Sequence, residues 1–337
     1  MIAIEYHSDL KEVQSDAALA SLLSADMQGA PFDRLAWWQG LAEHCDVRPL
    51  LAVARDGDAL AILPLRESGG QLAALANWYS FRTRPVISPG ADAPALLAAL
   101  ARDLGKRHAR IGLAGLPDED GSTRLLLAAF REAGWIAYRE ACDTNHVLHV
   151  GGRSYDEYLA TRPGPLRTTL KRKTGKVETT VLDRFDADAW ADYESIYAES
   201  WKPSEGSPDF LRAFARAEGE AGRLRLGVAR AGDDAVAAQM WTVEGGTAFI
   251  HKLAHRESAK PLSPGSVLSA ALFRRVVDVD KVALVDFGTG NDGYKRDWME
   301  EVRPRYRLDL LRPLSPRNWP IIARKSAQSL AGMGKHD

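Results

Sequence analysis

The sequence predicts an α/β fold in which a mixed β-sheet is flanked by helices, and this fold occurs twice in tandem. Three kinds of signal lead to this prediction: apolar runs of strand length, glycine-rich turns that join hairpins, and amphipathic helical stretches between them. The clearest unit spans residues 241–298, where a hairpin around 244–246 precedes a helix from Gly265 and an apolar strand over 282–287. Strand, helix and strand in this order predict a parallel βαβ unit.

Composition limits the classes of function. Of 337 residues, 45% are hydrophobic and 26% are charged, which is typical of a globular, water-soluble protein. The net charge of −1 argues against nucleic-acid binding over the whole surface. Cys45 and Cys142 are too few for a disulfide scaffold or a zinc site and fit a reducing compartment. With no signal peptide and no apolar run of about 18 residues, we expect a cytoplasmic protein without a membrane span.

The first half reads as a complete α/β unit. Its expected strands and helices follow from apolar periodicity and from turn residues such as Asp56-Gly57-Asp58. We expect strands at 1–6, 50–55, 59–65, 71–78 and 110–116, one or two more within 135–150, and helices at 32–44, 94–106 and 123–133.

The second half repeats this order of elements, although not the residues. We expect helices at 155–160, 165–174, 187–201, 208–221 and 265–278, and strands at 176–182, 223–230, 235–243, 282–287 and 306–311, besides the hairpin described above. The repeat predicts a boundary near Gly151-Gly152. The expected domains are 1–150 and 151–312, followed by a tail over 313–337. The tail is expected to be a docked helix or partly disordered, with a membrane-surface or partner contact as the alternative.

Four short motifs occur in a fixed order in the second half. They are Lys252-Leu253-Ala254, Ser263-Pro264-Gly265, the Asp286–Gly290 loop and Tyr294–Trp298. This series resembles the GNAT-superfamily acyltransferases, in particular the CelD-like (cellulose biosynthesis) branch that is related to FemAB-like transferases. The resemblance covers 155–311, and the first half only by architecture. The usual GNAT pyrophosphate loop is missing, so Ser263–Ser266 would have to replace it.

The helix start at Ser263, Gly265 and Ser266 is the expected donor site. Unpaired amide groups at a helix N-terminus suit a pyrophosphate or the polar end of a pantetheine arm, although the same residues also make a plain capped helix. The resemblance implies acetyl-coenzyme A or another acyl-coenzyme A as donor. The basic stretch 162–176 offers a positive face that could bind the phosphates of coenzyme A, an anionic acceptor or an RNA backbone, and the alternative is a solvated surface helix. The cations assigned to the donor are Lys252, Arg167, Lys171 and Lys295.

Three residues are candidates for catalysis. Asp286 ends the apolar strand, where its carboxylate either orients an amine as a general base or caps the glycine-rich turn. The resemblance implies that Tyr294 protonates the departing thiolate; otherwise its ring packs over the sheet edge. His251 is a candidate base or a structural group. Because adjacent strand residues point to opposite faces, we expect only one of His251 and Lys252 to enter a given cleft.

The acceptor is expected to be a small molecule, glycan or peptide with an amine or hydroxyl group. The residues assigned to it are Gln239, Trp241, Trp201, Lys202 and Asp292. No nucleophile elbow and no metal-ligand spacing are present, so direct transfer from a bound thioester is the simplest mechanism, with no metal. Two alternatives remain: a FemAB-like transferase that depends on aminoacyl-tRNA, and a non-catalytic GNAT scaffold that binds a metabolite or partner.

Overall fold

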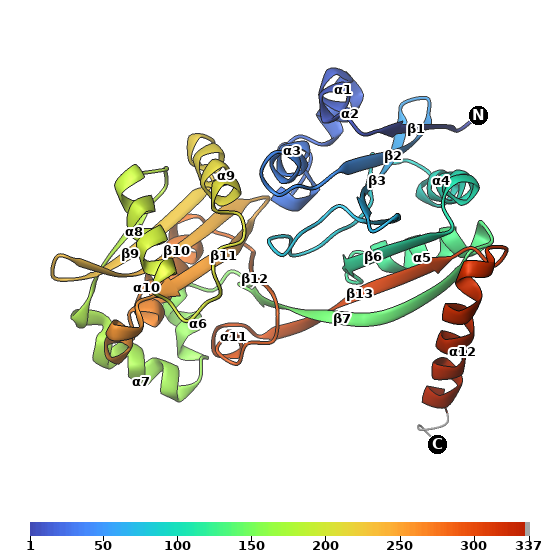
Figure 1. Ribbon diagram of the computed structural model, residues 1–337. Coiled ribbons are helices and arrows are strands. Elements are labelled where there is room, and N and C mark those ends of the chain that lie inside the picture. The colour runs from blue at the N-terminus through green and yellow to red at the C-terminus, as the bar shows by residue number, and fades with distance from the viewer. Residues whose placement is uncertain (334–337) are drawn as a thin grey trace. The chain divides into compact units, whose positions relative to one another are not determined.

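The structure is a computed structural model that describes residues 1–333, and it divides into two compact units. The first comprises residues from Met1 to Asp143 and those from Pro304 onward, and the second runs from Thr144 to Arg303 (Figure 1). Both are mixed sheets flanked by helices, which confirms the predicted fold class. The two units meet after residues 143 and 303 rather than at the expected 150 and 312. Strand β7 (Ile136–His149) crosses the first of these boundaries, and strand β13 (Glu301–Leu311) crosses the second. The domain assignment stays a prediction.

The sheet of the first unit includes a parallel pair of strands. Its strand order is β1-β2-β3-β4-β6-β13, with β5 paired to β3, and β4 runs parallel to β6. These strands are β1 (Ala3–His7), β2 (Pro49–Asp56), β3 (Ala59–Ser68), β4 (Gln71–Ala74), β5 (Val86–Ile87) and β6 (Arg110–Leu116). The helices are α1 (Leu10–Ser15), α2 (Ala17–Leu22), α3 (Leu35–His44), α4 (Ala93–Arg107), α5 (Ser122–Glu132) and α12 (Trp319–Met333).

One face of this sheet packs against α4 and α5. Ile111 and Leu113 of β6 are buried with Leu100 of α4 and Phe130 of α5. The expected strand at 71–78 is shorter than predicted. It ends at Ala74, and the backbone then turns where the Tyr79 amide donates to Asn77 Oδ1 at 3.0 Å. The short helices α1 and α2 were not predicted.

The tail folds back as α12 onto this unit. The Tyr138 hydroxyl donates to the Ile322 carbonyl oxygen at 3.1 Å, and Lys325 Nζ lies 2.7 Å from Asp309. The tail thus forms a helix over residues 319–333, and Ile322 and Lys325 join it to this unit, whereas residues 334–337 lie outside the described residues. Among residues 1–333, no helix is long and apolar enough to cross a bilayer.

The sheet of the second unit has the strand order β7-β12-β11-β10-β9-β8. The hairpin of β10 with β11 and the parallel pairing of β11 with β12 confirm the expected βαβ unit. Its other strands are β8 (Glu178–Leu182), β9 (Leu224–Ala231), β10 (Asp234–Glu244), β11 (Thr247–His255) and β12 (Leu284–Thr289). The helices are α6 (Tyr155–Ala160), α7 (Gly164–Lys173), α8 (Ala187–Ala198), α9 (Pro208–Glu220), α10 (Pro264–Arg274) and α11 (Lys295–Trp298).

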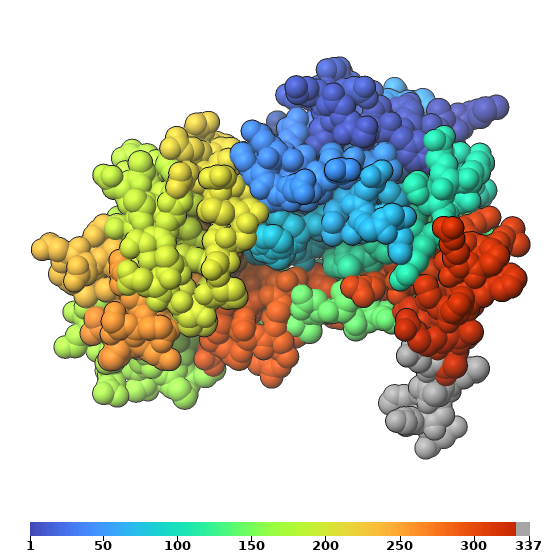
Figure 2. Space-filling model, viewed as in Figure 1, coloured from blue at the N-terminus to red at the C-terminus, as the bar shows by residue number. Residues whose placement is uncertain are grey.

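Helices cover both faces of this second sheet. On one face, Leu272 and Phe273 of α10 pack with Trp241 in a buried cluster that also includes residues of α6 and α7. The approach is close, since a Cβ on Gly227 of β9 would lie 2.9 Å from Leu272 Cδ1. Helices α8 and α9 lie on the other face, and their yellow-green and yellow atoms form much of the visible surface of this unit (Figure 2).

Candidate functional site

The parallel strands β11 and β12 separate soon after they pair. Their register runs from Thr247 opposite Leu284 to Phe249 opposite Asp286. Beyond this point no pairing joins them among the described residues, although β11 continues to His255. The edge of β11 therefore opens next to the carboxyl end of β12, which is where open α/β sheets place their ligands.

A β-bulge at His251 lies in this open stretch of β11. Trp241 of β10 pairs with Ile250 and Met240 pairs with Lys252, so His251 is the additional residue. His251 Nε2 lies 2.8 Å from Thr242 Oγ1, and its ring packs edge-on against Phe214 of α9. The expectation that His251 and Lys252 face opposite sides is wrong, because the bulge breaks the alternation and both side chains reach the α8 and α9 side.

The crossover helix α10 begins with an uncapped turn beside this opening. Ser263 adopts the left-handed conformation (φ 54°, ψ 45°), and its side chain makes no capping hydrogen bond. The amide groups of the first helical turn, including those of Gly265 and Ser266, have no acceptor within the helix. Gln239 Nε2 donates to the Gly265 carbonyl oxygen at 3.0 Å and thereby fixes the turn to β10. The turn that is predicted to bind an anion therefore has amide groups without acceptors in the helix and is hydrogen-bonded to β10.

Asp286 holds the turn that follows β12. Its Oδ1 accepts hydrogen bonds from the Gly288 amide at 2.8 Å and from Asn145 Nδ2 at 2.7 Å. Asn145 is fully buried in β7 and also donates to the Gly288 carbonyl oxygen at 3.2 Å. This geometry matches the capping interpretation of the Asp286 carboxylate, and Asn145 is a partner that sequence reasoning missed.

The loop after β12 presents Tyr294 at its surface. The Tyr294 ring is 37% exposed and packs edge-on against Phe287, with ring centroids 5.6 Å apart. Partial burial and, second, the charge of Asp292 raise the pKa of Tyr294, so its hydroxyl stays protonated at neutral pH. Lys295 is buried instead, with its ammonium group donating to the Thr289 carbonyl oxygen and lying over the Phe287 ring. Lys295 thus holds its own loop together.

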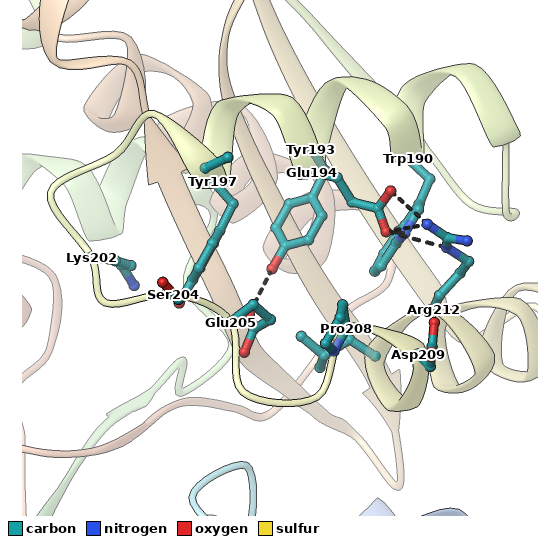
Figure 3. Close-up of a pocket in the computed structure, with 12 residues that line it drawn as sticks. Trp190, Tyr193, Glu194, Tyr197, Lys202, Ser204, Glu205, Pro208, Asp209 and Arg212 are labelled. Atoms are coloured by element: carbon teal, nitrogen blue, oxygen red, sulfur yellow. Dashed lines mark hydrogen bonds and ion pairs between the residues drawn. The ribbon is translucent and has the colours of Figure 1, made fainter. Parts of the chain in front are cut away.

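A pocket of about 410 Å³ lies between α8, α9 and the loop that connects them (Figure 3). Tyr193, Tyr197 and Trp190 form its aromatic wall, and Glu194 of that wall pairs with Arg212 of α9 at 2.7 Å. Lys202, Ser204, Glu205, Pro208, Asp209 and Leu211 are among the other lining residues. A volume of this size suits a small molecule.

Charged side chains connect this pocket to β11. Lys252 Nζ lies 2.8 Å from Glu205 Oε2, so the strand contributes a cation at the edge of the pocket. Burial, reinforced by the charge of Lys252, lowers the pKa of Lys202 to about 8, while Asp292 opposes this shift. Burial also lowers the pKa of Lys252, although its hydrogen bond to Glu205 acts against the shift. The predicted residues Lys202, Lys252 and Asp292 therefore share one electrostatic environment.

The remaining predicted residues lie elsewhere. Gln239 and Trp241 are fully buried beneath α10, where Trp241 Nε1 donates to Gln239 Oε1 at 2.9 Å, so both side chains tie the sheet to the helix. Trp201 is 48% exposed and packs against His255 at the end of β11, with ring centroids 4.5 Å apart. Arg167 and Lys171 are exposed on α7.

The aromatic wall and Glu205 were not among the predicted site residues. A signal for the wall was present, because Trp190, Tyr193 and Tyr197 recur at helical spacing on one face of α8. Glu205 gave no such signal, since its partner Lys252 is remote in sequence. Residues 1–333 contain no group of three His, Cys, Asp or Glu side chains arranged to hold a metal ion.

Comparisons with known proteins identify a family match within the second unit. Residues 165–296 match the acetyltransferase (GNAT) domain family. The chain is similar to FemX, with 12% identity, a TM-score of 0.60, and coverage of 94% of this chain and 99% of FemX. It is also similar to the C-terminal domain of a lysylphosphatidylglycerol synthetase candidate from Agrobacterium fabrum, with 14% identity, a TM-score of 0.59, and coverage of 89% and 92%. No curated protein sequence matches the chain.

A third similar structure has two GNAT units in one chain. It is a tandem GNAT protein from the clavulanic acid biosynthesis pathway, with 12% identity, a TM-score of 0.53, and coverage of 91% of this chain and 98% of that protein. At these identities the likeness describes the fold. The chain therefore has a tandem GNAT-like α/β fold, and within it residues 165–296 match the acetyltransferase (GNAT) domain family.

Proposed function

We propose that this protein is an acyltransferase that moves an acetyl or other acyl group from a coenzyme A thioester directly to an amine or hydroxyl. The observation that carries the proposal is the separation of β11 from β12 beside the uncapped first turn of α10. Amide groups and the helix dipole at Gly265 and Ser266 would bind the anionic or polar arm of the donor. The thioester would then lie along the open edge of β11, where a backbone N–H can polarise its carbonyl.

The pocket between α8 and α9 is the proposed acceptor site. Lys202 and Glu205 line this pocket, and Glu205 contacts Lys252 of β11. An acceptor amine in this pocket would therefore lie close to the thioester, which supplies much of the rate by proximity. The Glu205 carboxylate is the proposed group that orients the amine and takes its proton. His251 is the other candidate, and its contact with Thr242 supports a positioning role.

Tyr294 is the proposed general acid. The amine attacks the thioester carbonyl, the C–N bond forms and the C–S bond breaks, and the departing thiolate takes the phenolic proton. The exposed ring and the raised pKa of Tyr294 support this role, because the proton remains available at neutral pH. Asp286 is proposed as a positioning residue, which shapes the loop that presents Tyr294 through its bond to the Gly288 amide.

A second candidate is an aminoacyl-tRNA-dependent transferase of the FemAB type. The likeness to FemX and the exposed cations Arg167 and Lys171 on α7 support it. The order of the four sequence motifs supports, in turn, a place in the CelD-like branch. In both cases the acyl group would still be transferred at the opening of β11. The two candidates differ in the molecule that carries the acyl group.

A binding experiment separates these candidates. We expect acetyl-coenzyme A or a longer acyl-coenzyme A to stabilise the protein in a thermal-shift scan, because a ligand at 100 times its Kd adds roughly 2.7 kcal/mol. Binding of aminoacyl-tRNA without any response to thioesters would favour the FemAB type. If neither donor class binds at millimolar thioester or micromolar tRNA, the chain is a scaffold rather than a transferase.

A further inference from the structure

The first unit contains a second concave site, whose lining residues all lie outside residues 165–296. It is a groove of about 580 Å³ whose floor is formed by β3, β4, β6 and β13. Along β6, Ile111 and Leu113 are buried against α4 and α5, whereas the alternate residues Gly112 and Ala114 line the groove. Because strand residues alternate, the groove lies on the sheet face opposite these two helices.

The middle of the groove floor lacks side-chain bulk. One row of paired residues crosses the four strands from Arg66 through Ala73 and Gly112 to Asp309. A Cβ placed on Gly112 would meet nothing within 4 Å, so the space above this position is open. With neighbouring strands about 4.8 Å apart, the row spans roughly 14 Å, which is the length of a nucleotide-sized molecule.

The charged residues of the groove are mostly basic. Arg66, Arg110 and Arg307 line it, with Asp46 at the rim and Asp309 in the floor. Lys325 Nζ lies 2.7 Å from Asp309 Oδ2, whereas the Arg110 guanidinium lies 3.8 Å from Asp309 Oδ1. The Nε atoms of Arg66 and Arg110 are buried without a hydrogen-bond partner among the described residues. Lys325 therefore already offsets Asp309, so the three guanidinium groups outweigh the carboxylates of the groove, and the Nε atoms of Arg66 and Arg110 remain as donors for a ligand.

An exposed aromatic ring completes the groove. Trp78 lines the rim and is 66% exposed, which is unusual for the largest apolar side chain. Its indole offers a flat surface for a ring, while arginine forks match the oxygen atoms of phosphate in a bidentate way. We propose that this groove binds a phosphate ester that carries a flat ring, of nucleotide size, with Arg66 and Arg307 on the phosphate and Trp78 on the ring.

Calorimetric titration with ADP tests the proposal, and inorganic phosphate and adenosine serve as part-ligands. We expect ADP to bind more tightly than either part-ligand, because the groove contacts both the phosphate and the ring. ADP should also quench tryptophan fluorescence. In Trp78→Phe most of the quenching should be lost while ADP still binds. If adenosine binds as tightly as ADP, or if ADP does not bind at millimolar concentration, the proposal is overturned.

Two variants locate the bound ADP without endangering the fold. Gly112→Ile fills the open space above the floor, and Gly112 has no positive φ that would strain a larger residue. Arg66→Gln removes a guanidinium whose buried Nε atom has no hydrogen-bond partner among the described residues. We expect each to weaken ADP binding at least tenfold.

The matched control is Arg124→Gln, on the exposed surface of α5 across the sheet, which should bind ADP like the parent protein. Equal affinity in the parent protein, Gly112→Ile and Arg66→Gln would place ADP elsewhere and overturn the proposal. All three variants are compared after thermal unfolding has shown that they are folded. Acyl transfer is not the readout, so a failure of this site and a failure of the proposed function are separate results.

Discussion

The two βαβ units of the chain have the same topology but different helix starts. In the first, the connection from β4 to β6 contains β5 and then α4, and the N-cap Asp92 of α4 accepts a hydrogen bond from the Ala95 amide at 3.1 Å. In the second, α10 connects β11 to β12, and its N-cap Ser263 makes no side-chain bond. A carboxylate at the first start satisfies an amide and repels anions, whereas the second start leaves its amides available.

The ends of the parallel pairing differ as well. The last paired residue of β6 is Gly112, and the last paired residue of β12 is Asp286. At this position the first unit has the open floor of a groove, whereas the second has a carboxylate that fixes a glycine-rich turn. The same fold therefore places different chemistry at equivalent positions. The second unit therefore has the features proposed for acyl transfer, whereas the first unit has those proposed for a separate anion site.

The largest expected effect is on turnover in Tyr294→Phe. Removal of the phenolic proton should lower kcat by about 100-fold and leave donor Kd within a few-fold, because a general acid contributes at least this much. Since the pKa of Tyr294 is raised, the parent activity should not fall through titration of this group at any pH below 10. Steady-state kinetics with acetyl-coenzyme A provide the measurement. Tyr306→Phe in the first unit is the control, and normal turnover in Tyr294→Phe would reject the role.

A second prediction concerns the carboxylate that ends β12. Asp286→Ala removes the carboxylate oxygen that accepts from the Gly288 amide and from Asn145 Nδ2, which should lower the free energy of unfolding by roughly 1–3 kcal/mol. Asp286→Asn retains an acceptor oxygen and should lose less. Chemical denaturation of the two variants measures the difference. If Asp286→Asn is stable but inactive, the carboxylate acts in chemistry rather than as a cap.

Much of the fold was predictable because local signals agreed with it. The apolar run ending at Phe287 and the Gly245-Gly246 turn predicted β12 and the hairpin, and the structure places these elements within a few residues. The Ser263–Ser266 helix start was found for the same reason. These features depend on neighbours in sequence, so periodicity and turn chemistry reveal them.

The parts that sequence reasoning missed depend on contacts between remote segments. The bulge at His251 exists only relative to the register of β10, and it reversed the expected direction of one side chain. The pairing of Lys252 with Glu205 and of Asp286 with Asn145 joins residues that no spacing rule connects. Gln239 and Trp241 were assigned to an acceptor pocket, yet α10 covers them, because the strand face that a helix covers is a tertiary property.

A third prediction concerns a variant in which α10, like α4, has a carboxylate at its start. Ser266→Asp places a carboxylate in the first turn of α10, which should weaken donor binding about tenfold by repelling its phosphates. The same change should slightly stabilise the helix, so a loss of affinity would not reflect unfolding. The donor Kd from calorimetry is the measurement. The control, Ala95→Asp, changes the matching third helical position of α4 and should leave this Kd unchanged. An equal Kd in Ser266→Asp would move the donor site elsewhere.

The smallest expected effect is a pH-dependent gain in the stability of the protein when Lys202 is replaced by an uncharged residue. Because burial lowers the pKa of Lys202 to about 8, the charged form is disfavoured in the folded state. The unfolded chain binds more protons between pH 8 and pH 10.5, so this cost is fully present below pH 8 and disappears as pH rises through that window. Lys202→Met should therefore raise the free energy of unfolding at pH 7 by on the order of 1–3 kcal/mol.

The pH profile of this gain shows whether the cost comes from desolvation of the Lys202 charge or from poor packing of its side chain. Urea unfolding of the parent and of Lys202→Met at pH 7, 9 and 10.5 should show a difference that shrinks toward zero. Lys171→Met on exposed α7 is the control and should change stability by less than about 0.5 kcal/mol at each pH. A gain that stays constant up to pH 10.5 would mean that Lys202 is well solvated. A well-solvated Lys202 would not influence which protonation state of the acceptor the pocket binds. Glu205 would then have to orient the amine without help from Lys202.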